Sequence, residues 1–331
     1  MTRLAIIGGG SWGTALALVL ARNFAEVRLW VYEKDLAVRM GRLRENDVFL
    51  PGFRIPPNVW VTTELAEALG NAQIVLGVMP SHHARSLYAQ MASHLGPGTI
   101  LVSATKGLEE GTLLRISAVI GETLGQAAAR LAVLSGPTFA REVARGEPAA
   151  VVVASADHKL AKSVQEAFSG PTLRLYTNSD VAGVEIGAAL KNVVAIGAGV
   201  CQGLGLGSNT LAALITRGLA EMTRLAVAMG AEARTLAGLA GLGDLVLTCT
   251  GELSRNRTVG LKLARGHRLG EVLTTTPMVA EGVRTTYAAI ELSRRYGVEM
   301  PITEQMYAML ARGKPPHEAV RELMDRTLKG E

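Results

Sequence analysis

The stretch RLAIIGGGSWGTALALVLAR, residues 3–22, joins a short apolar run to a helical pattern through a glycine-rich loop. Gly8, Gly10 and Gly13 have the spacing G-x-G-x-x-G. In such a loop the glycines permit a tight turn, a close approach of the backbone to a diphosphate and close packing of helix on strand, and the helix N-terminus binds the anion. The motif alone is weak, but its place between a strand and a helix predicts a dinucleotide-binding domain.

The rest of the chain has two different patterns. Short β-branched runs at residues 3–8, 26–32, 73–79, 99–105, 130–136 and 149–155 alternate with helical segments, which indicates a parallel, doubly wound sheet. After a last strand near Leu175 and a helix-start signal at Ser179 and Asp180, long helical stretches follow, at 211–229, 279–296 and 316–328. The sequence therefore predicts an α/β, Rossmann-like domain over residues 1–178 and an all-helical domain over residues 179–331.

Composition narrows the class of ligand. The chain has 331 residues, 48% of them hydrophobic, which suffices for two cores. Its net charge is +5, yet it has no run of basic residues and few aromatics, so we expect small anionic ligands and no nucleic acid. Cys201 and Cys249 stand in apolar surroundings and are predicted to be buried free thiols, with neither a disulfide nor a metal site.

An uncharged segment, residues 192–216, raises the question of a membrane span. Several glycines and the polar group Ser208, Asn209 and Thr210 interrupt it, which favours a buried helical pair and no stable membrane insertion. The N-terminus shows no hydrophobic region of signal-peptide length, so a cytoplasmic protein is expected.

The end of the second predicted strand addresses the choice of cofactor. Glu33 lies where an acid binds the ribose 2′-hydroxyl of NAD, whereas Lys34 could instead meet the 2′-phosphate of NADP. Glu33 could equally be an ordinary helix-start acid. The residues therefore leave the choice between NAD and NADP open.

Polar residues follow three other strands, at the edge where doubly wound sheets hold ligands. Lys106 lies in SATKGLEEGT, and Gly136 and Thr138 lie in LSGPTFARE, where a helix is expected to begin at Thr138. The alternatives are a solvated lysine and a plain turn with an N-cap. For His82 and His83 a helix-start role is favoured over catalysis.

Lys191 and Asp244 are charged outliers in apolar segments. Lys191 lies in VEIGAALKNVVAIGAGV, whose helix should be buried, and a buried ammonium requires a partner or a purpose. Burial disfavours its charged form and makes it a credible proton donor and acceptor. We expect Asp244 to orient Lys191, and Asn192 and Thr248 to hydrogen-bond substrate oxygens; the alternatives are a lysine that reaches solvent and a helix-capping aspartate.

Downstream of Asp244, the run Ser254-Arg255-Asn256-Arg257 combines a helix cap with a guanidinium and an amide. Helix amides, the fork of Arg255 and the Asn256 amide can converge on one phosphate-sized anion. A solvated helix start explains the bare run equally well. Arg257 is expected on the helix surface.

Taken together, these motifs resemble the bacterial type of NAD(P)-dependent sn-glycerol-3-phosphate dehydrogenase, essentially from end to end. The resemblance rests on GGGSWGTALA, VMPSHHAR, SATKGLE, LSGPTFAREVARGEPAA, EIGAALKNVVAIGAGV, ALITRGLAEMTRLAVAMGA, GLAGLGDLVLTCTGELSRNRTVG, VAEGVRTT and VEMPITE. It implies reversible reduction of dihydroxyacetone phosphate to sn-glycerol 3-phosphate by NADH or NADPH, for phospholipid synthesis. It also implies a homodimer and no metal.

The resemblance also assigns roles by position. Lys191 corresponds to the family's general acid/base and Asp244 to its partner, with Thr248 nearby. The matching substrate-binding positions are Lys106, Gly136, Thr138, Lys191, Asp244, Ser254, Arg255 and Asn256, with Asn192 beside them. The matching cofactor-binding positions are Ser11, Trp12, Tyr32, Lys106, Ala140, Arg255, Val279 and Glu281.

One departure and two rival functions remain. Many family members have a basic residue or histidine where this chain has Tyr32, which leaves NAD plausible. A hydroxyacid or ketopantoate type of two-domain dehydrogenase would lack the cluster from Ser254 to Asn256. A non-catalytic dinucleotide-sensing module would have no reason to bury Lys191 with Asp244.

Overall fold

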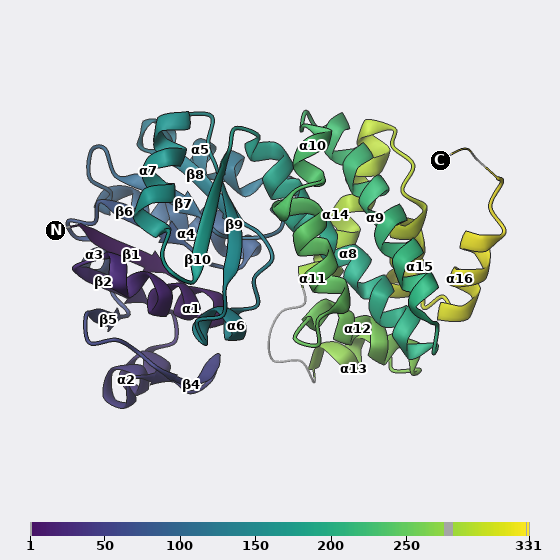
Figure 1. Cartoon of the computed structure of the whole chain (residues 1–331), viewed down its shortest axis with the longest axis horizontal. Coiled ribbons are helices and arrows are strands. Elements are labelled where there is room, and N and C mark those ends of the chain that lie inside the picture. Colours follow the sequence, from purple (N-terminus) through teal and green to yellow (C-terminus); the bar gives the residue numbers. More distant parts are fainter. Residues whose placement is uncertain (1, 275–280, 329, 331) are drawn as a thin grey trace. The chain divides into compact units, whose positions relative to one another are not determined.

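The computed structural model describes residues 2–274, 281–328 and 330. The chain divides into two compact units, Met1–Glu185 and Ile186–Glu331, which differ in architecture (Figure 1). The domain boundary that the sequence predicts between residues 178 and 179 stays a prediction.

Unit 1 is built on an eight-stranded sheet in the order β10-β9-β8-β7-β6-β1-β2-β5. The six strands predicted in the first half are all present, together with the last strand near Leu175 and a strand that was not predicted, β5. The bounds are β1 Arg3–Ile7, β2 Glu26–Trp30, β5 Val59–Thr62, β6 Ile74–Gly77, β7 Ile100–Ser103, β8 Leu131–Ser135, β9 Ala149–Ala154 and β10 Leu173–Asn178. A separate pair, β3 Glu45–Asn46 and β4 Leu50–Arg54, is antiparallel.

The sheet is doubly wound, but it is not parallel throughout. Strand β9 runs antiparallel to β8, and β10 runs parallel to β9, so these two strands oppose the rest. The segment between β8 and β9 holds only the five-residue helix α6, Ala140–Ala144, which packs against α1. A parallel return usually carries a crossover helix that packs on the sheet, whereas α6 has only five residues and packs against α1.

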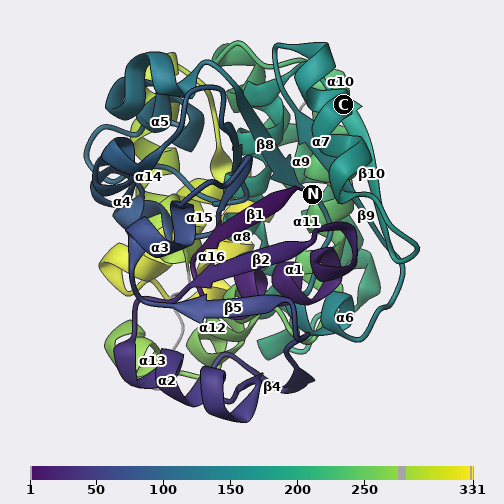
Figure 2. The ribbon, with the colours of Figure 1, turned by 90° about the vertical axis from the view of Figure 1, so that its left-hand side faces the viewer.

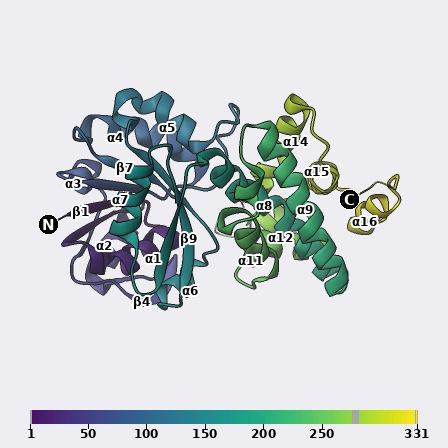
Figure 3. The ribbon, with the colours of Figure 1, turned by 45° about the horizontal axis from the view of Figure 1, so that its top comes forward.

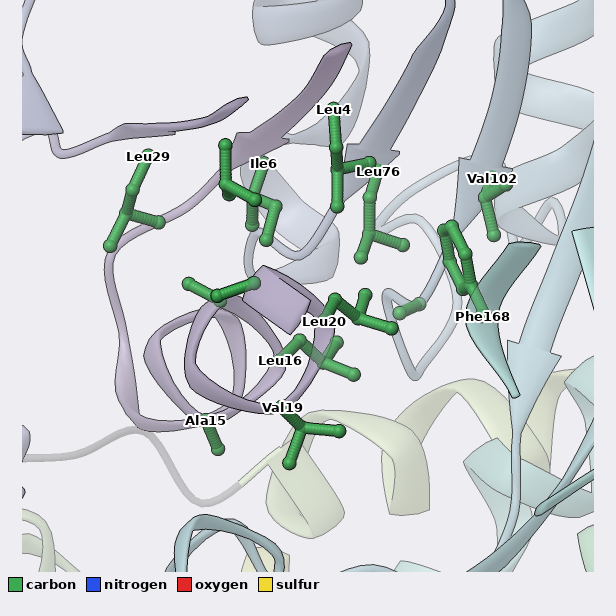
Figure 4. Packing of buried hydrophobic residues seen from close by; sticks show 14 of the residues in the cluster. Leu4, Ile6, Ala15, Leu16, Val19, Leu20, Leu29, Leu76, Val102 and Phe168 are labelled. Atoms are coloured by element: carbon green, nitrogen blue, oxygen red, sulfur yellow. The ribbon is translucent and has the colours of Figure 1, made fainter. Parts of the chain in front are cut away.

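Helices cover both faces of this sheet (Figure 2). On one face, Leu4 and Ile6 of β1 and Leu76 of β6 pack with Leu16 and Leu20 of α1 (Figure 4). The intervening residues of β1 point to the other face because side chains alternate along a strand, and they pack with α3, α4 and α5. The helices are α1 Ser11–Leu20, α2 Lys34–Leu43, α3 Leu65–Leu69, α4 Ala84–Met91, α5 Ile116–Leu124, α6 and α7 His158–Phe168, with short 3₁₀ turns η1 Ala21–Asn23, η2 Ser81–His83, η3 Ala92–His94 and η4 Gly125–Ala128.

The strand order places one ligand position in unit 1. From β1 the chain moves outward to β2 and β5 and then returns to β6 on the other side of β1. The carboxyl ends of β1 and β6 therefore flank a topological switch point, where open α/β sheets bind their ligands. The glycine loop follows β1 at this point.

Every regular element of unit 2 within the described residues is a helix (Figure 3). The helices are α8 Val181–Gly203, α9 Ser208–Ala228, α10 Ala233–Leu236, α11 Asp244–Thr250, α12 Arg255–Ala264, α13 Leu269–Thr274, α14 Glu281–Tyr296, α15 Pro301–Arg312 and α16 Pro316–Met324, with the π-helix η5 Leu239–Gly243 before α11. Helix α8 begins in the last residues of unit 1. The predicted helical stretches correspond to α9, α14 and α16.

Helix α8 is long and apolar enough to cross a membrane, but its apolar window is completely buried, as in the core helix of a globular unit. Two glycines let α12 approach it closely. A Cβ on Gly199 would lie 1.9 Å from the Arg257 carbonyl oxygen, and one on Gly260 would lie 1.9 Å from the Ile196 carbonyl oxygen. These contacts fix the position of α12 along α8.

Candidate active site

The glycine loop in unit 1 has the steric features that a diphosphate cradle needs. A Cβ on Gly8, which has φ +129°, would lie 2.4 Å from the Val78 carbonyl oxygen, and one on Gly13 would lie 1.9 Å from the Gly8 carbonyl oxygen. These two glycines are therefore required by the chain's own packing. A Cβ on Gly10, in contrast, would meet no protein atom within 4 Å.

The space beside Gly10 is what a ligand approaching the backbone requires. Gly10 is the N-cap of α1 and adopts an extended conformation without a side-chain cap. The amides of the next residues, Ser11 and Trp12, belong to the first turn of α1, whose N–H groups have no partner within the helix. The start of α1 can therefore receive an anion.

The carboxyl edge of the sheet brings Lys106 and the Gly136 turn together. The Lys106 ammonium donates to the Gly136 carbonyl at 3.3 Å, and the Thr138 hydroxyl donates to the same oxygen at 3.2 Å. Helix α6 begins at Ala140 rather than at Thr138, because the extended Phe139 is its N-cap. Thr138 therefore stabilises the turn instead of starting the helix.

The predicted ribose-binding position lies at the end of β2. Glu33 is the N-cap residue of α2, but its side chain makes no capping hydrogen bond. Lys34 is the first residue of α2, and both side chains are exposed, as is Tyr32, at 77%. The helix-start position of Glu33 is thus real, while its carboxylate is not used as a cap.

The central feature of unit 2 is a buried ion pair between Lys191 on α8 and Asp244 on α11. The two residues are 5% and 1% exposed, so Lys191 does not reach for solvent. A buried charge is tolerated only when it is paired. The predicted pairing of the two outliers is therefore present, and it brings an ammonium into the centre of the unit.

Asp244 owes its position to an irregular turn. The π-helix η5 ends at Gly243, whose amide donates to the Gly238 carbonyl five residues back, and α11 begins at Asp244. Single π-turns often occur at functional sites. The Thr248 hydroxyl, one turn further on, donates to the Asp244 carbonyl at 2.6 Å, so it meets a substrate oxygen as a donor only by giving up that bond.

The predicted anion site lies at the start of α12. Ser254 is the N-cap, and its hydroxyl accepts from the Arg257 amide at 3.3 Å. Arg255 is exposed; desolvation by the surrounding chain lowers the pKa of its guanidinium, and the charge of Glu281 opposes that shift. Arg257 is half-buried, and its guanidinium donates to the Gly251 carbonyl at 3.1 Å.

A hydrogen-bonded relay connects this anion site to α8. The Gly282 amide donates to Asn256 Oδ1 at 3.0 Å, and Asn256 Nδ2 donates to Asn192 Oδ1 at 2.9 Å. A backbone N–H can only donate, so it fixes the orientation of both amide groups. The Asn192 Nδ2 atom is then turned away from Asn256, as a donor suited to a substrate oxygen. Within the described residues, no metal-binding group of three or more His, Cys, Asp or Glu side chains occurs.

Other predicted residues have simpler positions. His82 and His83 lie in the 3₁₀ turn η2 just before α4, in the helix-start position favoured for them. Cys201 and Cys249 are buried free thiols, and burial raises the pKa of Cys249 to about 12. Val279 lies outside the described residues.

Two residues near these groups carried no motif of their own in the sequence. Asn46, fully buried, contacts the glycine loop. Gly282 begins the relay, and a Cβ there would lie 2.6 Å from Asn256 Oδ1 and 2.8 Å from the Asn192 carbonyl oxygen. The only sequence signal for Gly282 is its place in VAEGVRTT.

Comparisons with known proteins agree with this pattern over nearly the whole chain. Residues 3–161 match the family described as NAD-dependent glycerol-3-phosphate dehydrogenase N-terminus, and residues 180–321 match the corresponding C-terminus. Glycerol-3-phosphate dehydrogenase (NAD(P)+) from Koribacter versatilis is 56% identical over 329 residues, covering 98% of each chain. The enzyme of the same name from Geobacter sulfurreducens is 54% identical, covering 99% of this chain and 98% of its own.

A solved structure supports the same assignment. The crystal structure of glycerol-3-phosphate dehydrogenase from Coxiella burnetii superposes with a TM-score of 0.93 at 41% identity, covering 98% of this chain and 99% of its own. Identity at this level, over both units, extends well beyond a shared fold. The chain therefore belongs to the NAD-dependent glycerol-3-phosphate dehydrogenase family.

Proposed function

We propose that this protein catalyses the reversible reduction of dihydroxyacetone phosphate to sn-glycerol 3-phosphate with NADH or NADPH, and so provides the backbone of phospholipids. One observation carries the proposal: consecutive residues of α8, Lys191 and Asn192, contact a buried acid and the anion site, respectively. A proton donor and a phosphate site at a fixed separation are what a phosphorylated ketone requires.

Lys191 is the proposed acid and base. During reduction the substrate carbonyl carbon receives a hydride, and its oxygen receives a proton from the Lys191 ammonium. The proton returns to Lys191 when the alcohol is oxidised. Asp244 holds the ammonium in place and stabilises its charged form, since a buried opposite charge favours ionisation.

The start of α12 is the proposed phosphate site. The capped helix start offers backbone amides, and Arg255 and Asn256 add a guanidinium and a side-chain amide. Ser254 acts there mainly as the cap. Binding energy at the phosphate, remote from the reacting carbon, then positions the carbonyl for catalysis.

Further polar groups within each unit are proposed to bind the substrate. Lys106, held at the Gly136 carbonyl, adds positive charge, and Thr138 stabilises that turn. In unit 2, Asn192 Nδ2 is a donor for a substrate oxygen, and Thr248 supports the backbone at Asp244.

The glycine loop is the proposed site of the cofactor diphosphate, because the space at Gly10 fits a closely approaching ligand. The bound nicotinamide supplies or accepts the hydride. We assign further contacts to Ser11, Trp12, Ala140, Arg255 and Glu281. Val279 keeps its proposed cofactor role from the resemblance alone.

At the ribose end of the cofactor, Glu33 accepts hydrogen bonds from a 2′-hydroxyl and repels a 2′-phosphate, whereas Lys34 attracts one. Tyr32 supplies an exposed ring beside them. The proposal therefore covers both NAD and NADP.

An absorbance assay of the reduced cofactor tests the function. Dihydroxyacetone phosphate is supplied with NADH or NADPH, and unphosphorylated dihydroxyacetone, ketopantoate and a 2-oxo acid serve as controls. At equal concentration, we expect the phosphorylated ketone to be turned over far faster than any of the three controls. Binding of NADH without turnover of any substrate would favour a dinucleotide-sensing module, and preferred turnover of ketopantoate would favour the rival dehydrogenase class.

We also propose a cytoplasmic homodimer, on the basis of the family resemblance. Sedimentation equilibrium of the purified protein measures its mass in solution, and cell fractionation followed by immunodetection locates it. A monomer at micromolar concentration, or recovery in the membrane fraction, would contradict these two assignments separately.

A further inference from the structure

Asn46 stands apart from every residue assigned above and contacts the glycine loop from a distant part of unit 1. It lies in the two-residue strand β3, 37 positions along the chain from Gly9, and its side chain is completely buried. Its amide nitrogen donates to the Gly9 carbonyl at 2.8 Å and to the Thr14 hydroxyl at 2.8 Å. Its oxygen accepts from the Phe49 amide at 2.9 Å.

These contacts concentrate on one carbonyl group. The Thr14 hydroxyl also donates to the Gly9 oxygen, at 3.3 Å, so that this oxygen accepts two side-chain hydrogen bonds. A Cβ on Gly9 would lie 2.6 Å from the Val31 side chain, which holds the other side of the residue against the sheet. The peptide group between Gly9 and Gly10 is therefore fixed in one orientation.

The orientation of that peptide group decides where the next amide points. In a trans peptide the C=O and the following N–H lie in one plane and point in opposite directions. Because the Gly9 carbonyl points toward Asn46, the Gly10 N–H points away from it. Gly10 is also the residue whose surroundings are open to a ligand.

We infer that Asn46 is a positioning residue for the cofactor: by holding the Gly9 carbonyl it presents the Gly10 amide to the cofactor diphosphate. This inference rests on the proposed function. Asn46 itself does not touch the cofactor. It fixes the Gly10 amide, which donates to the cofactor diphosphate, and a preorganised donor binds an anion without first reorienting.

Asn58 provides a matched control, because its side chain also contacts the backbone next to α1. Its amide nitrogen also makes two hydrogen bonds to the backbone, to the Ala21 carbonyl at 2.8 Å and the Phe24 carbonyl at 3.0 Å. It thus secures the end of α1 as Asn46 secures the beginning. Removing either side chain takes away two donors, but only Asn46 faces the glycine loop.

The test titrates NADH and NADPH, in the absence of substrate, into wild type and three variants and follows the fluorescence of the reduced nicotinamide. We expect Asn46→Ala to raise the cofactor Kd about tenfold, because the Gly10 amide is then no longer held in position as a hydrogen-bond donor. Thr14→Val, which removes the longer of the two bonds to Gly9, should raise it about threefold. Asn58→Ala should leave the Kd within about twofold, although its melting temperature falls.

Steady-state kinetics supply a second readout. Asn46→Ala should raise the KM for the cofactor about tenfold while kcat and the KM for dihydroxyacetone phosphate change less than about twofold. If Asn46→Ala does not fold, Asn46→Asp replaces it, because the carboxylate still accepts from Phe49 but cannot donate to Gly9.

The outcomes separate this inference from the function on which it rests. An unchanged Kd in both Asn46 variants, or an equal loss in Asn58→Ala, would overturn the positioning role while wild type still binds and turns over. Absence of cofactor binding by wild type would instead overturn the proposed function itself.

Discussion

The proposed ligand sites of the two units are built from different parts of the chain. Around the glycine loop, unit 1 offers backbone: amides at the start of α1 and space where Gly10 has no side chain. Unit 2 offers side chains that the fold has buried, above all Lys191 and Asp244. Adding a side chain to the glycine loop of unit 1 should therefore impair ligand binding. In unit 2, removing the side chain of Lys191 or Asp244 should impair catalysis.

This difference follows from the chemistry proposed for each unit, diphosphate binding in unit 1 and proton transfer in unit 2. A diphosphate is bound well by several N–H groups, which every residue except proline provides, so the requirement falls on shape. A proton transfer needs one titratable group with a defined partner, which only particular side chains provide.

The largest effect is expected at Lys191. Lys191→Met should lower kcat about 10³-fold, because the proton donor is lost. It should also lower the free energy of unfolding by about 3–5 kcal/mol, because Asp244 is left buried without its partner. Steady-state kinetics and chemical denaturation measure the two losses.

A second variant separates catalysis from stability at this pair. In Lys191→Met/Asp244→Leu both charges are replaced by apolar groups, and such replacements are often neutral or stabilising. We expect the free energy of unfolding to recover while kcat stays about 10³-fold low. Recovery of activity along with stability would show that Lys191 is structural.

The glycine loop should respond to added methyl groups in two distinct ways. Gly13→Ala should lower the free energy of unfolding by about 3 kcal/mol, since its Cβ would lie 1.9 Å from the Gly8 carbonyl oxygen. Gly10→Ala should change stability by less than about 1 kcal/mol, because no protein atom lies within reach. It should nevertheless raise the cofactor Kd about 10- to 100-fold, because the methyl group occupies the ligand's space. Equal loss of stability in both variants would remove the distinction.

A variant of Arg255 tests the proposed phosphate site at the start of α12. Arg255→Ala should raise the KM for dihydroxyacetone phosphate about 10- to 100-fold, through the loss of a charged hydrogen bond. Arg265, an exposed arginine at the other end of α12, is the matched control, and Arg265→Ala should leave KM within about twofold. Activity on unphosphorylated dihydroxyacetone, measured at high concentration, should be unaffected by either change; a parallel loss there would argue against phosphate binding by Arg255.

Next to the proposed phosphate site of unit 2, Gly282 is a position that has no room for a side chain, as are Gly8 and Gly13 in unit 1. Gly282→Ala should raise the KM for dihydroxyacetone phosphate about tenfold, because the methyl group collides with Asn256 and disturbs the relay to Asn192. Gly270→Ala on α13, where no protein atom lies within 4 Å, should leave KM unchanged and add up to about 1 kcal/mol of stability. Identical kinetics for the two variants would show that the relay is dispensable.

The sequence was sufficient for features that local pattern controls. The six strands, the helical second half, the glycine loop and the Ser254 cap each follow from residues close together in the chain. The pairing of Lys191 with Asp244 could also be predicted, because a buried charge demands a partner and the apolar segments offer few.

Other features depend on contacts that no local pattern specifies. The direction of β9 depends on how the short α6 segment packs. The bond from Asn46 to Gly9 joins a side chain to a backbone oxygen 37 residues away, with no periodicity to reveal it. The bond from the Arg257 guanidinium to the Gly251 carbonyl likewise has no signal in the local pattern.

The last expected effect concerns stability and pH, with no loss of activity. It compares two buried carboxylates that each accept hydrogen bonds at a helix start. Glu185 in unit 1 accepts from Ser117 and from the Arg115 guanidinium, and burial raises its pKa against the lowering effects of these partners. Glu221 in unit 2 accepts from the Ile302 and Thr303 amides. Burial raises the pKa of Glu221 to about 7, against the lowering effects of those hydrogen bonds and of Arg224.

Because the pKa of Glu221 is higher in the folded protein than its ordinary value of 4.5, the folded state binds its proton more tightly. The resulting stability is fully present below about pH 4.5 and is lost as pH rises through 7, by up to about 3 kcal/mol in total. Glu221→Gln should therefore flatten the change in melting temperature between pH 5 and about pH 8. Glu322→Gln at the surface pair with Lys314, where the pKa is lowered instead, should leave that slope unchanged. A slope as steep in Glu221→Gln as in wild type would mean that the helix-capping hydrogen bonds keep the Glu221 carboxylate ionised despite its burial.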